Sequence, residues 1–134
     1  MLANLKITEY LEKAAAGTAV PGGGSVAALN ASLAAGLTEM VANLTIGKKG
    51  YEAVAGEMSD ISARAAELRK KLTAAIDQDA EAYSAVMAAF KLPRATDSEK
   101  ELRKQEIQKA FKHAALVPLE VANHAVKVID LAGR

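Results

Sequence analysis

Three consecutive glycines stand near the start of this chain, within the run from Val20 to Leu29, which reads VPGGGSVAAL. Glycine loses the most backbone freedom on ordering, so the run is expected where φ is positive or where another group approaches the bare backbone closely. Ser25 then opens a small-residue stretch that favours a helix, and its hydroxyl can cap backbone N–H groups. A helix that starts after such a turn offers N–H donors to an anion. The run predicts either an anion-binding loop or a tight corner before a closely packed helix.

The composition limits the chemistry available to the chain. Its 134 residues, 51% of them hydrophobic, are enough for a single domain over 1–134 with its own core. Lys and Arg (17) nearly balance Asp and Glu (16), so no overall field favours nucleic acid or an anionic membrane. No cysteine and two histidines occur, so thiolate chemistry is excluded and no metal site is expected. The N-terminus lacks a secretion-signal pattern, which predicts a cytoplasmic protein.

Hydrophobic periodicity predicts an all-α protein, because Ala, Leu, Lys and Glu dominate and no period-two run occurs. Helices are expected over about 8–17, 25–44 and 52–92, with a fourth that follows a capping box at Thr96 and Glu99. Pro118 should kink or split that fourth helix. In the first helix, Leu11, Ala14 and Ala15 are expected to face inward.

The second predicted helix is apolar on most sides, which is typical of a central helix covered by others. Its length approaches that of a membrane span, but residues such as Glu39 are expensive in lipid, so a helix buried within protein is expected. Ser25, Ser32, Glu39 and Asn43 lie on one stripe at helical spacing. The stripe either lines a pocket or makes satisfied contacts with a neighbouring helix.

A carboxylate interrupts the apolar seam of the third predicted helix. The seam comprises Val54, Met58, Ile61, Ala65, Leu68, Leu72, Ile76, Tyr83, Val86 and Phe90. Asp79 fills its one gap, with Tyr83 one turn away on the same face. A carboxylate among core residues is either paired structurally or serves as a general acid or base. Both roles remain open for Asp79 at this point.

Two other polar features have ordinary structural explanations. Lys48 and Lys49 lie in a Gly-flanked turn, which alone indicates a solvated loop. His124 falls between Val121 and Val128 on core spacing, where a lone histidine is more often a hydrogen-bonded core residue than a catalyst.

Four blocks of the chain, at 20–29, 40–51, 79–93 and 117–122, resemble the cyclodeaminase/cyclohydrolase family. This family includes the C-terminal part of formiminotransferase-cyclodeaminase and stand-alone methenyltetrahydrofolate cyclohydrolases. The resemblance implies an up-and-down helical bundle with long helices that forms a homodimer. It also implies an enzyme that acts on one-carbon tetrahydrofolates, by hydrolysis or by ring closure with loss of ammonia, without a metal or redox cofactor.

The resemblance places Asp79 in the active site as the catalytic residue and implies that six residues bind the folate: Gly22, Gly23, Gly24, Ser25, Lys48 and Lys49. Tyr83 is expected to pack on the ring system or to orient Asp79. Family domains continue with further helices beyond the point that corresponds to residue 134, so a domain without its last helices is expected. The alternative from another class is a non-catalytic helical oligomerisation module or an inactive paralogue.

Overall fold

The computed structural model describes all 134 residues, and every regular element in it is helical. Three long helices, α2 (Gly23–Thr45), α3 (Ala55–Phe90) and α4 (Asp97–Ala132), form the body of the molecule, and a short α1 (Ile7–Ala15) precedes them. Two 3-10 turns, η1 (Leu2–Asn4) and η2 (Glu52–Val54), stand before α1 and α3. The prediction of an all-α fold is confirmed.

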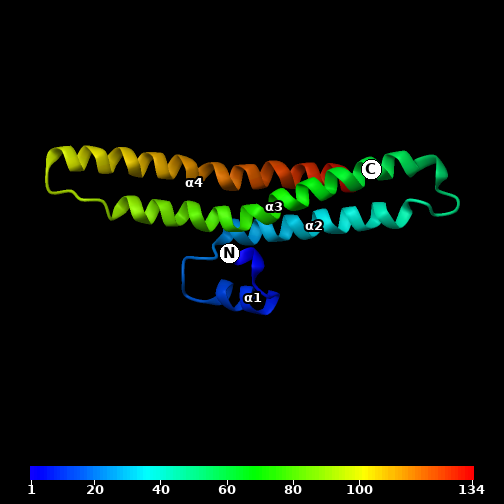
Figure 1. The fold of residues 1–134 in the computed structure, drawn as a ribbon, viewed down its shortest axis with the longest axis horizontal. Helices are drawn as coiled ribbons and strands as arrows, with labels where there is room; N and C mark the ends of the chain where they lie inside the picture. Colours follow the sequence, from blue (N-terminus) through cyan, green and yellow to red (C-terminus); the bar gives the residue numbers. More distant parts are fainter.

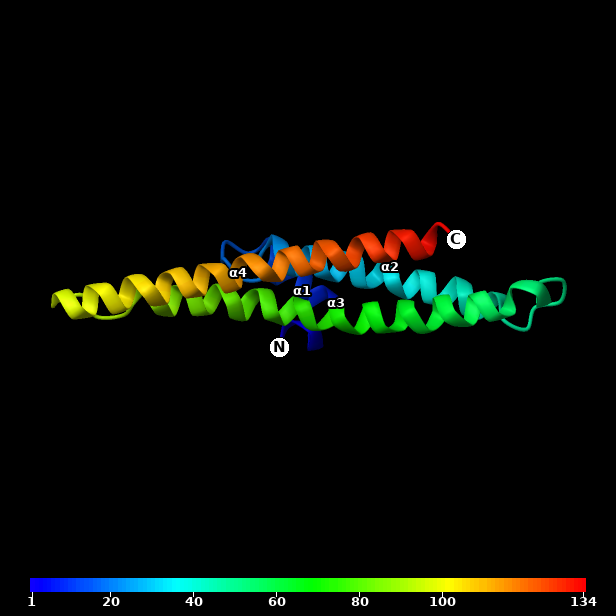
Figure 2. The same cartoon turned by 90° about the horizontal axis from the view of Figure 1, so that it is seen from above.

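The three long helices run up and down along one another (Figure 1). α3 packs against both of its neighbours, and α2 also contacts α4. At about 1.5 Å per residue, the 36 residues of α3 and of α4 span about 54 Å, whereas the 23 residues of α2 span about 35 Å. The second half of α3 and the first half of α4 therefore extend beyond α2 as a two-helix arm (Figures 1 and 2).

Small residues bring α2 close to α3. Ala28, Ala35 and Ala42 lie at most 1% exposed on the inner face of α2, opposite larger core residues of α3 such as Leu72. Away from this face, α2 carries five large exposed apolar side chains: Leu33, Leu37, Met40, Val41 and Leu44. The prediction of a central helix covered by others therefore holds only in part within this chain, because α3 and α4 lie on only part of the circumference of α2. α2 is the one helix long and apolar enough to meet the length and composition criteria for a membrane span.

The capping box at the start of α4 is confirmed, since the Glu99 N–H donates to Thr96 Oγ1 at 3.2 Å. Pro118 does not split α4, which continues as one helix through Ala132. Buried Val117 and Val121 flank the proline and hold both halves in the core. This packing explains why the loss of one backbone hydrogen bond does not end the helix.

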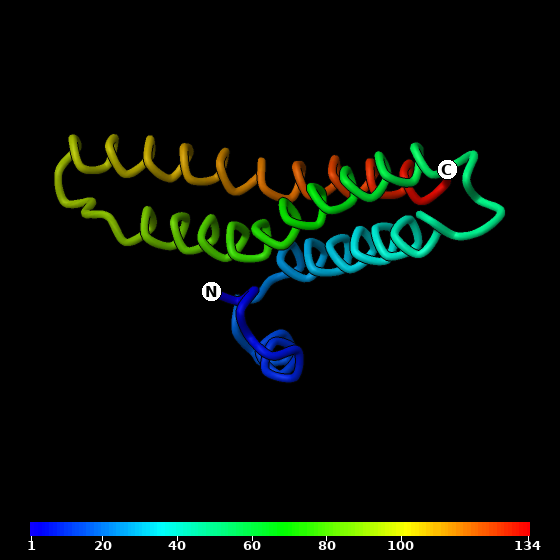
Figure 3. The backbone as a smooth tube through the Cα atoms, turned by 45° about the vertical axis from the view of Figure 1, so that its right-hand side comes forward, coloured from blue at the N-terminus to red at the C-terminus, as the bar shows by residue number.

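The N-terminal segment folds against the start of α2 and the middle of α3 (Figure 3). α1 buries Tyr10, which is 5% exposed, whereas Leu11 is 59% exposed and Ala14 and Ala15 are exposed as well. The predicted inward face of this helix was therefore wrong. A nine-residue helix carries too few apolar positions for periodicity to fix its rotation.

Candidate functional site

Asp79 of α3 lies against the first turn of α2. The Ser25 backbone N–H donates to Asp79 Oδ2 at 3.0 Å, and Ser25 Oγ lies 3.3 Å from the same oxygen. Ser25 Oγ also donates to the Ile76 carbonyl at 2.7 Å, which ties α2 to α3 one turn before Asp79. No side chain of α2 itself caps this end of the helix. The anion at the α2 N-terminus is therefore a carboxylate of the chain itself.

Gly24 permits this approach of Asp79 to the helix. A Cβ on Gly24 would lie 2.0 Å from Asp79 Oδ1, whereas a Cβ on Gly23 would meet nothing within 4 Å. Only Gly47 and Gly50 have a positive φ in this chain, so none of the three consecutive glycines does. Of the two reasons for a glycine run, close approach is therefore the one that applies, and it applies chiefly at Gly24.

A pocket of about 320 Å³ opens beside Asp79, within the range of small-molecule sites. Its walls are Ala19, Val20, Gly22, Gly23, Gly24, Ala82, Tyr83, Val86, Phe111 and Ala114, together with Asp79. Asp79 is the one charged residue among them, and its Oδ1 accepts no hydrogen bond from the chain. One carboxylate oxygen is thus fixed by Ser25 while the other is free, in a largely apolar pocket.

Tyr83 lies beside Asp79 in this pocket, as the helical spacing predicts. Tyr83 is 41% exposed, and Phe90 farther along α3 is 42% exposed, so these two members of the predicted seam are not core residues. Val86 of the same seam is 7% exposed, so the buried face of α3 is interrupted at these two positions and does not end there. No hydrogen bond joins Tyr83 to Asp79, and the aromatic ring serves as a wall of the pocket.

Lys48 and Lys49 lie at the opposite end of α2 from the glycine run. They belong to the turn that joins α2 to α3, where Lys48 Nζ stands 4.9 Å from the centre of the Tyr51 ring. The 23 residues of α2 separate this turn from Asp79 by about 35 Å (Figure 1). Within one chain, the structure brings Gly22, Gly23, Gly24, Ser25 and Tyr83 to Asp79, and it does not bring the two lysines there.

The polar stripe of α2 makes satisfied contacts with α3 rather than lining a pocket. Ser32 Oγ lies 2.8 Å from Thr73 Oγ1, and Ser62 Oγ donates to Asn43 Oδ1 at 2.6 Å. Arg69 Nε donates to Glu39 Oε2 at 2.7 Å, and this hydrogen bond lowers the pKa of Glu39. Ser25, at the end of the stripe, is the member that reaches the site.

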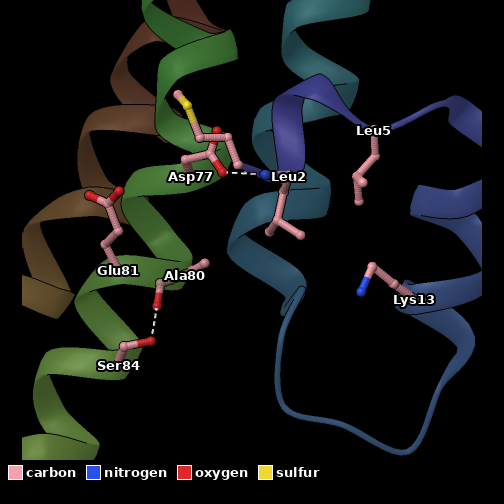
Figure 4. A pocket seen from close by; sticks show the side chains of 8 residues that line it. Leu2, Leu5, Lys13, Asp77, Ala80, Glu81 and Ser84 are labelled. Carbon is pink, nitrogen blue, oxygen red and sulfur yellow. Dashed lines mark hydrogen bonds between the residues drawn. The ribbon is translucent and has the colours of Figure 1, made fainter.

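Two residues near the site were not identified from the sequence. Asp77 is 8% exposed, and it accepts hydrogen bonds from the backbone N–H groups of Leu2 and Ala3, which fasten η1 to α3 (Figure 4). Tyr10 is buried, and its hydroxyl has no hydrogen-bond partner. Burial, and then the charges of Asp79 and Asp77, raise the pKa of Tyr10. No local pattern reveals either residue, because both depend on how the N-terminal segment docks.

Asp77 borders a second, more open pocket of about 520 Å³ (Figure 4). Two residues along a helix correspond to about 200° of rotation, so this pocket lies on a different side of α3 from Asp79. His124 lines a third pocket, together with Glu120 and Lys71, apart from the Asp79 site. His113 is exposed on α4 and lines neither the Asp79 pocket nor that of His124.

Comparison with known proteins identifies the family of the chain. Residues 6–134 match the family described as formiminotransferase-cyclodeaminase. The chain is 42% identical over 132 residues to a methenyltetrahydrofolate cyclohydrolase from Methylorubrum extorquens, covering 98% of this chain and 64% of that protein. It is 40% identical over 114 residues to formimidoyltransferase-cyclodeaminase from Gallus gallus, covering 85% of this chain and 20% of that protein. The chain thus spans less than two thirds of the length of these relatives.

A solved structure has the same fold. The crystal structure of formiminotetrahydrofolate cyclodeaminase from Thermotoga maritima aligns with a TM-score of 0.76 and 30% sequence identity, covering 99% of this chain and 73% of that one. Sequence and structure therefore agree over almost the entire chain. The chain belongs to the formiminotransferase-cyclodeaminase family.

Proposed function

We propose that this chain is a folate one-carbon enzyme, with methenyltetrahydrofolate cyclohydrolase activity as the first candidate and formiminotetrahydrofolate cyclodeaminase activity as the second. The observation that carries the proposal is the asymmetry of Asp79. Oδ2 is held by Ser25 at the start of α2, and Oδ1 is left without a partner beside a pocket with apolar walls. A carboxylate fixed in this way is suited to accept and return one proton.

In the hydrolase reaction, water adds to the methenyl carbon of the folate and a ring nitrogen then leaves. Asp79 Oδ1 would take the proton from the attacking water and deliver it to the leaving nitrogen. In the deaminase reaction, a folate nitrogen attacks the formimino carbon and ammonia leaves, and the same oxygen would carry the proton. Because Gly24 and Ser25 keep Asp79 in place, the proton acceptor needs no rearrangement before either reaction.

The pocket walls support the binding of a flat ring system. Tyr83 and Phe111 present aromatic surface from α3 and α4, and Val20 and Val86 add apolar contacts. The pocket has no cationic wall, so the glutamate tail of a folate needs another partner. Lys48 and Lys49 remain predicted for that role, and we propose that a homodimer would supply them from its second chain.

The greater identity to a cyclohydrolase, over 98% of the chain, favours hydrolysis over deamination. The test is to assay both substrates side by side, following the absorbance of methenyltetrahydrofolate and the release of ammonia. Asp79→Asn should abolish turnover because an amide oxygen cannot accept the proton, and far-UV circular dichroism should be unchanged. Asp60→Asn is the matched control, since Asp60 lies on the same helix in an exposed pair with Arg64.

Equal turnover by the wild type and Asp79→Asn would remove Asp79 from the mechanism. Isothermal titration with a reduced folate separates binding from chemistry, and Lys48→Ala combined with Lys49→Ala should weaken binding.

The exposed apolar side chains Leu33, Leu37 and Leu44 on α2 favour the second class of function, a helical assembly module. Absence of both folate binding and turnover would support that alternative.

A further inference from the structure

The aromatic wall that Phe111 gives to the Asp79 pocket stands on a part of α4 with no buried residue. The buried residues of α4 all lie at or after Val117, and Phe111 itself is 48% exposed. This first half of α4 belongs to the two-helix arm that extends beyond α2 (Figures 1 and 2). Burial in the core therefore does not fix the position of this pocket wall.

Phe90, in the last turn of α3, packs its ring against the ring of Phe111. The two ring centres lie 5.9 Å apart and the ring planes meet at 82°. This edge-to-face arrangement is one of the favoured geometries for a pair of aromatic rings. Phe90 does not line the Asp79 pocket, so it supports the Phe111 wall without facing the pocket itself.

Arg103 of α4 holds Phe90 in two ways. Its Nε and Nη2 donate to the Phe90 carbonyl at 3.3 and 3.2 Å, and its Cζ stands 5.6 Å from the centre of the Phe90 ring. No backbone N–H donates to this carbonyl, as is usual in the last turn of a helix. The planar guanidinium suits both contacts, because it presents several N–H donors in a fixed fork and stacks on aromatic rings.

Arg103 also provides the side-chain hydrogen bonds that join the first half of α4 to α3. The other side-chain hydrogen bonds of this half stay within residues 95–105. The contacts therefore run from Arg103 on α4 to Phe90 on α3, and from Phe90 back to Phe111 on α4. We call these three side chains the arm clamp.

We propose that Arg103 and Phe90 are positioning residues, which hold the Phe111 ring in place as the wall against which the substrate ring system binds. The catalytic meaning of this assignment rests on the proposed function, whereas the contacts of the arm clamp do not. Neither Arg103 nor Phe90 lines the pocket, so both act through Phe111. Asp79 is held by Ser25 of α2, outside the arm, so loosening the clamp affects substrate binding and not the proton acceptor.

The first experiment needs no activity. The chain has no tryptophan, so Phe111→Trp places a single fluorescent reporter in the pocket wall, at a half-exposed position with room for the larger ring. In this background, Arg103→Met should increase quenching by acrylamide and shift the emission to the red, because the reporter loses its support. Far-UV circular dichroism should be unchanged.

Lys104→Met in the same background is the matched control. Lys104 is the next residue of α4, but it lines a polar groove formed by α4 alone and has no contact with Phe90. Its quenching and emission should match those of Phe111→Trp by itself. Equal quenching in the Arg103→Met and Lys104→Met backgrounds would overturn the arm clamp.

The second experiment measures the consequence for the reaction, with methenyltetrahydrofolate as the substrate. Arg103→Met and Phe90→Leu should each raise KM about fivefold and leave kcat unchanged, since one aromatic contact behind the wall is lost while Asp79 stays in place. Phe90→Tyr keeps the ring and should restore KM most of the way to the wild-type value. A merely structural role for Phe90 would not produce this split between KM and kcat.

A double-mutant cycle tests whether Phe90 acts through Phe111. Phe111→Leu should raise KM, and adding Phe90→Leu to it should raise KM little further, because the wall that Phe90 supports is already gone. Effects on KM that multiply independently in the double variant would overturn the role of Phe90 as a positioning residue.

The outcomes separate the two proposals. A wild type inactive on both substrates, combined with increased quenching in Arg103→Met, would reject the proposed function and retain the arm clamp. An active wild type, with KM unchanged in Arg103→Met and Phe90→Leu, would overturn the positioning role and leave Asp79 as the proton carrier.

Discussion

The Asp79 carboxylate of α3 lies where a side chain on Gly24 of α2 would otherwise be. A Cβ on Gly24 would lie 2.0 Å from Asp79 Oδ1 and 2.6 Å from Cγ. The carboxylate reaches the start of α2 because no side chain intervenes, and there it accepts the Ser25 N–H. This contact joins the most unusual sequence run of the chain to the one charged residue of the pocket.

Gly24→Ala should displace Asp79 from the α2 N-terminus and destabilise the protein by about 1–3 kcal/mol, the usual range for overpacking. Turnover should fall with it, because the proton acceptor moves. Gly23→Ala is the matched control: its Cβ meets nothing within 4 Å, and replacing a helical glycine by alanine should stabilise the protein by up to about 1 kcal/mol. Thermal denaturation of both variants checks the stability changes. Similar melting temperatures for the two variants would contradict this account.

Asp77→Ala should release the N-terminal segment from α3. The backbone N–H groups of Leu2 and Ala3 lose their acceptor, which should cost about 1–3 kcal/mol of stability. Amide NMR spectra should show residues 2–15 becoming mobile while the long helices keep their chemical shifts. Glu81→Ala, at an exposed position one turn along the same side of α3, should leave the segment docked.

Arg69→Met should destabilise the protein in a pH-dependent way. The hydrogen bond from Arg69 lowers the pKa of Glu39 in the folded state, so the pair adds stability above the ordinary Glu value of 4.5. That stability is lost as the pH falls through the lowered pKa of the folded protein. The melting temperatures of wild type and variant should therefore differ most near neutral pH and converge in acid.

Arg64→Met is the control for this prediction, since Arg64 pairs with Asp60 on an exposed surface. Its effect on the melting temperature should be small at every pH. A difference between wild type and Arg69→Met that stays constant down to low pH would show that lost packing, not the ion pair, causes the change.

Thr96→Ala should destabilise α4 by about 1 kcal/mol, because the Glu99 N–H loses its acceptor at the helix start. Glu99→Gln should have a smaller effect, since a glutamine side chain can still accept from the Thr96 N–H, which now donates to Glu99 Oε2 at 2.9 Å. Urea denaturation midpoints measure both changes. Identical midpoints for Thr96→Ala and wild type would argue against the capping box as a source of stability.

Local signals in the sequence were sufficient for the helices and for part of the site. Periodicity and composition predict an all-α chain, and the Thr96–Glu99 box predicts the start of α4 at Asp97. The gap at Asp79 in an apolar seam is also a local signal, because helical spacing alone places Asp79 and Tyr83 on one face. These features depend on residues within one or two turns of one another.

The tertiary structure decided what those residues touch. It showed that the α2 stripe of Ser32, Glu39 and Asn43 is satisfied by α3, that Lys48 and Lys49 lie about 35 Å from Asp79, and that Tyr10 is the buried residue of α1. Each outcome depends on the rotation and axial offset of one helix relative to another. Periodicity within a helix carries no information on these two quantities, because they are set by packing between residues far apart in the chain.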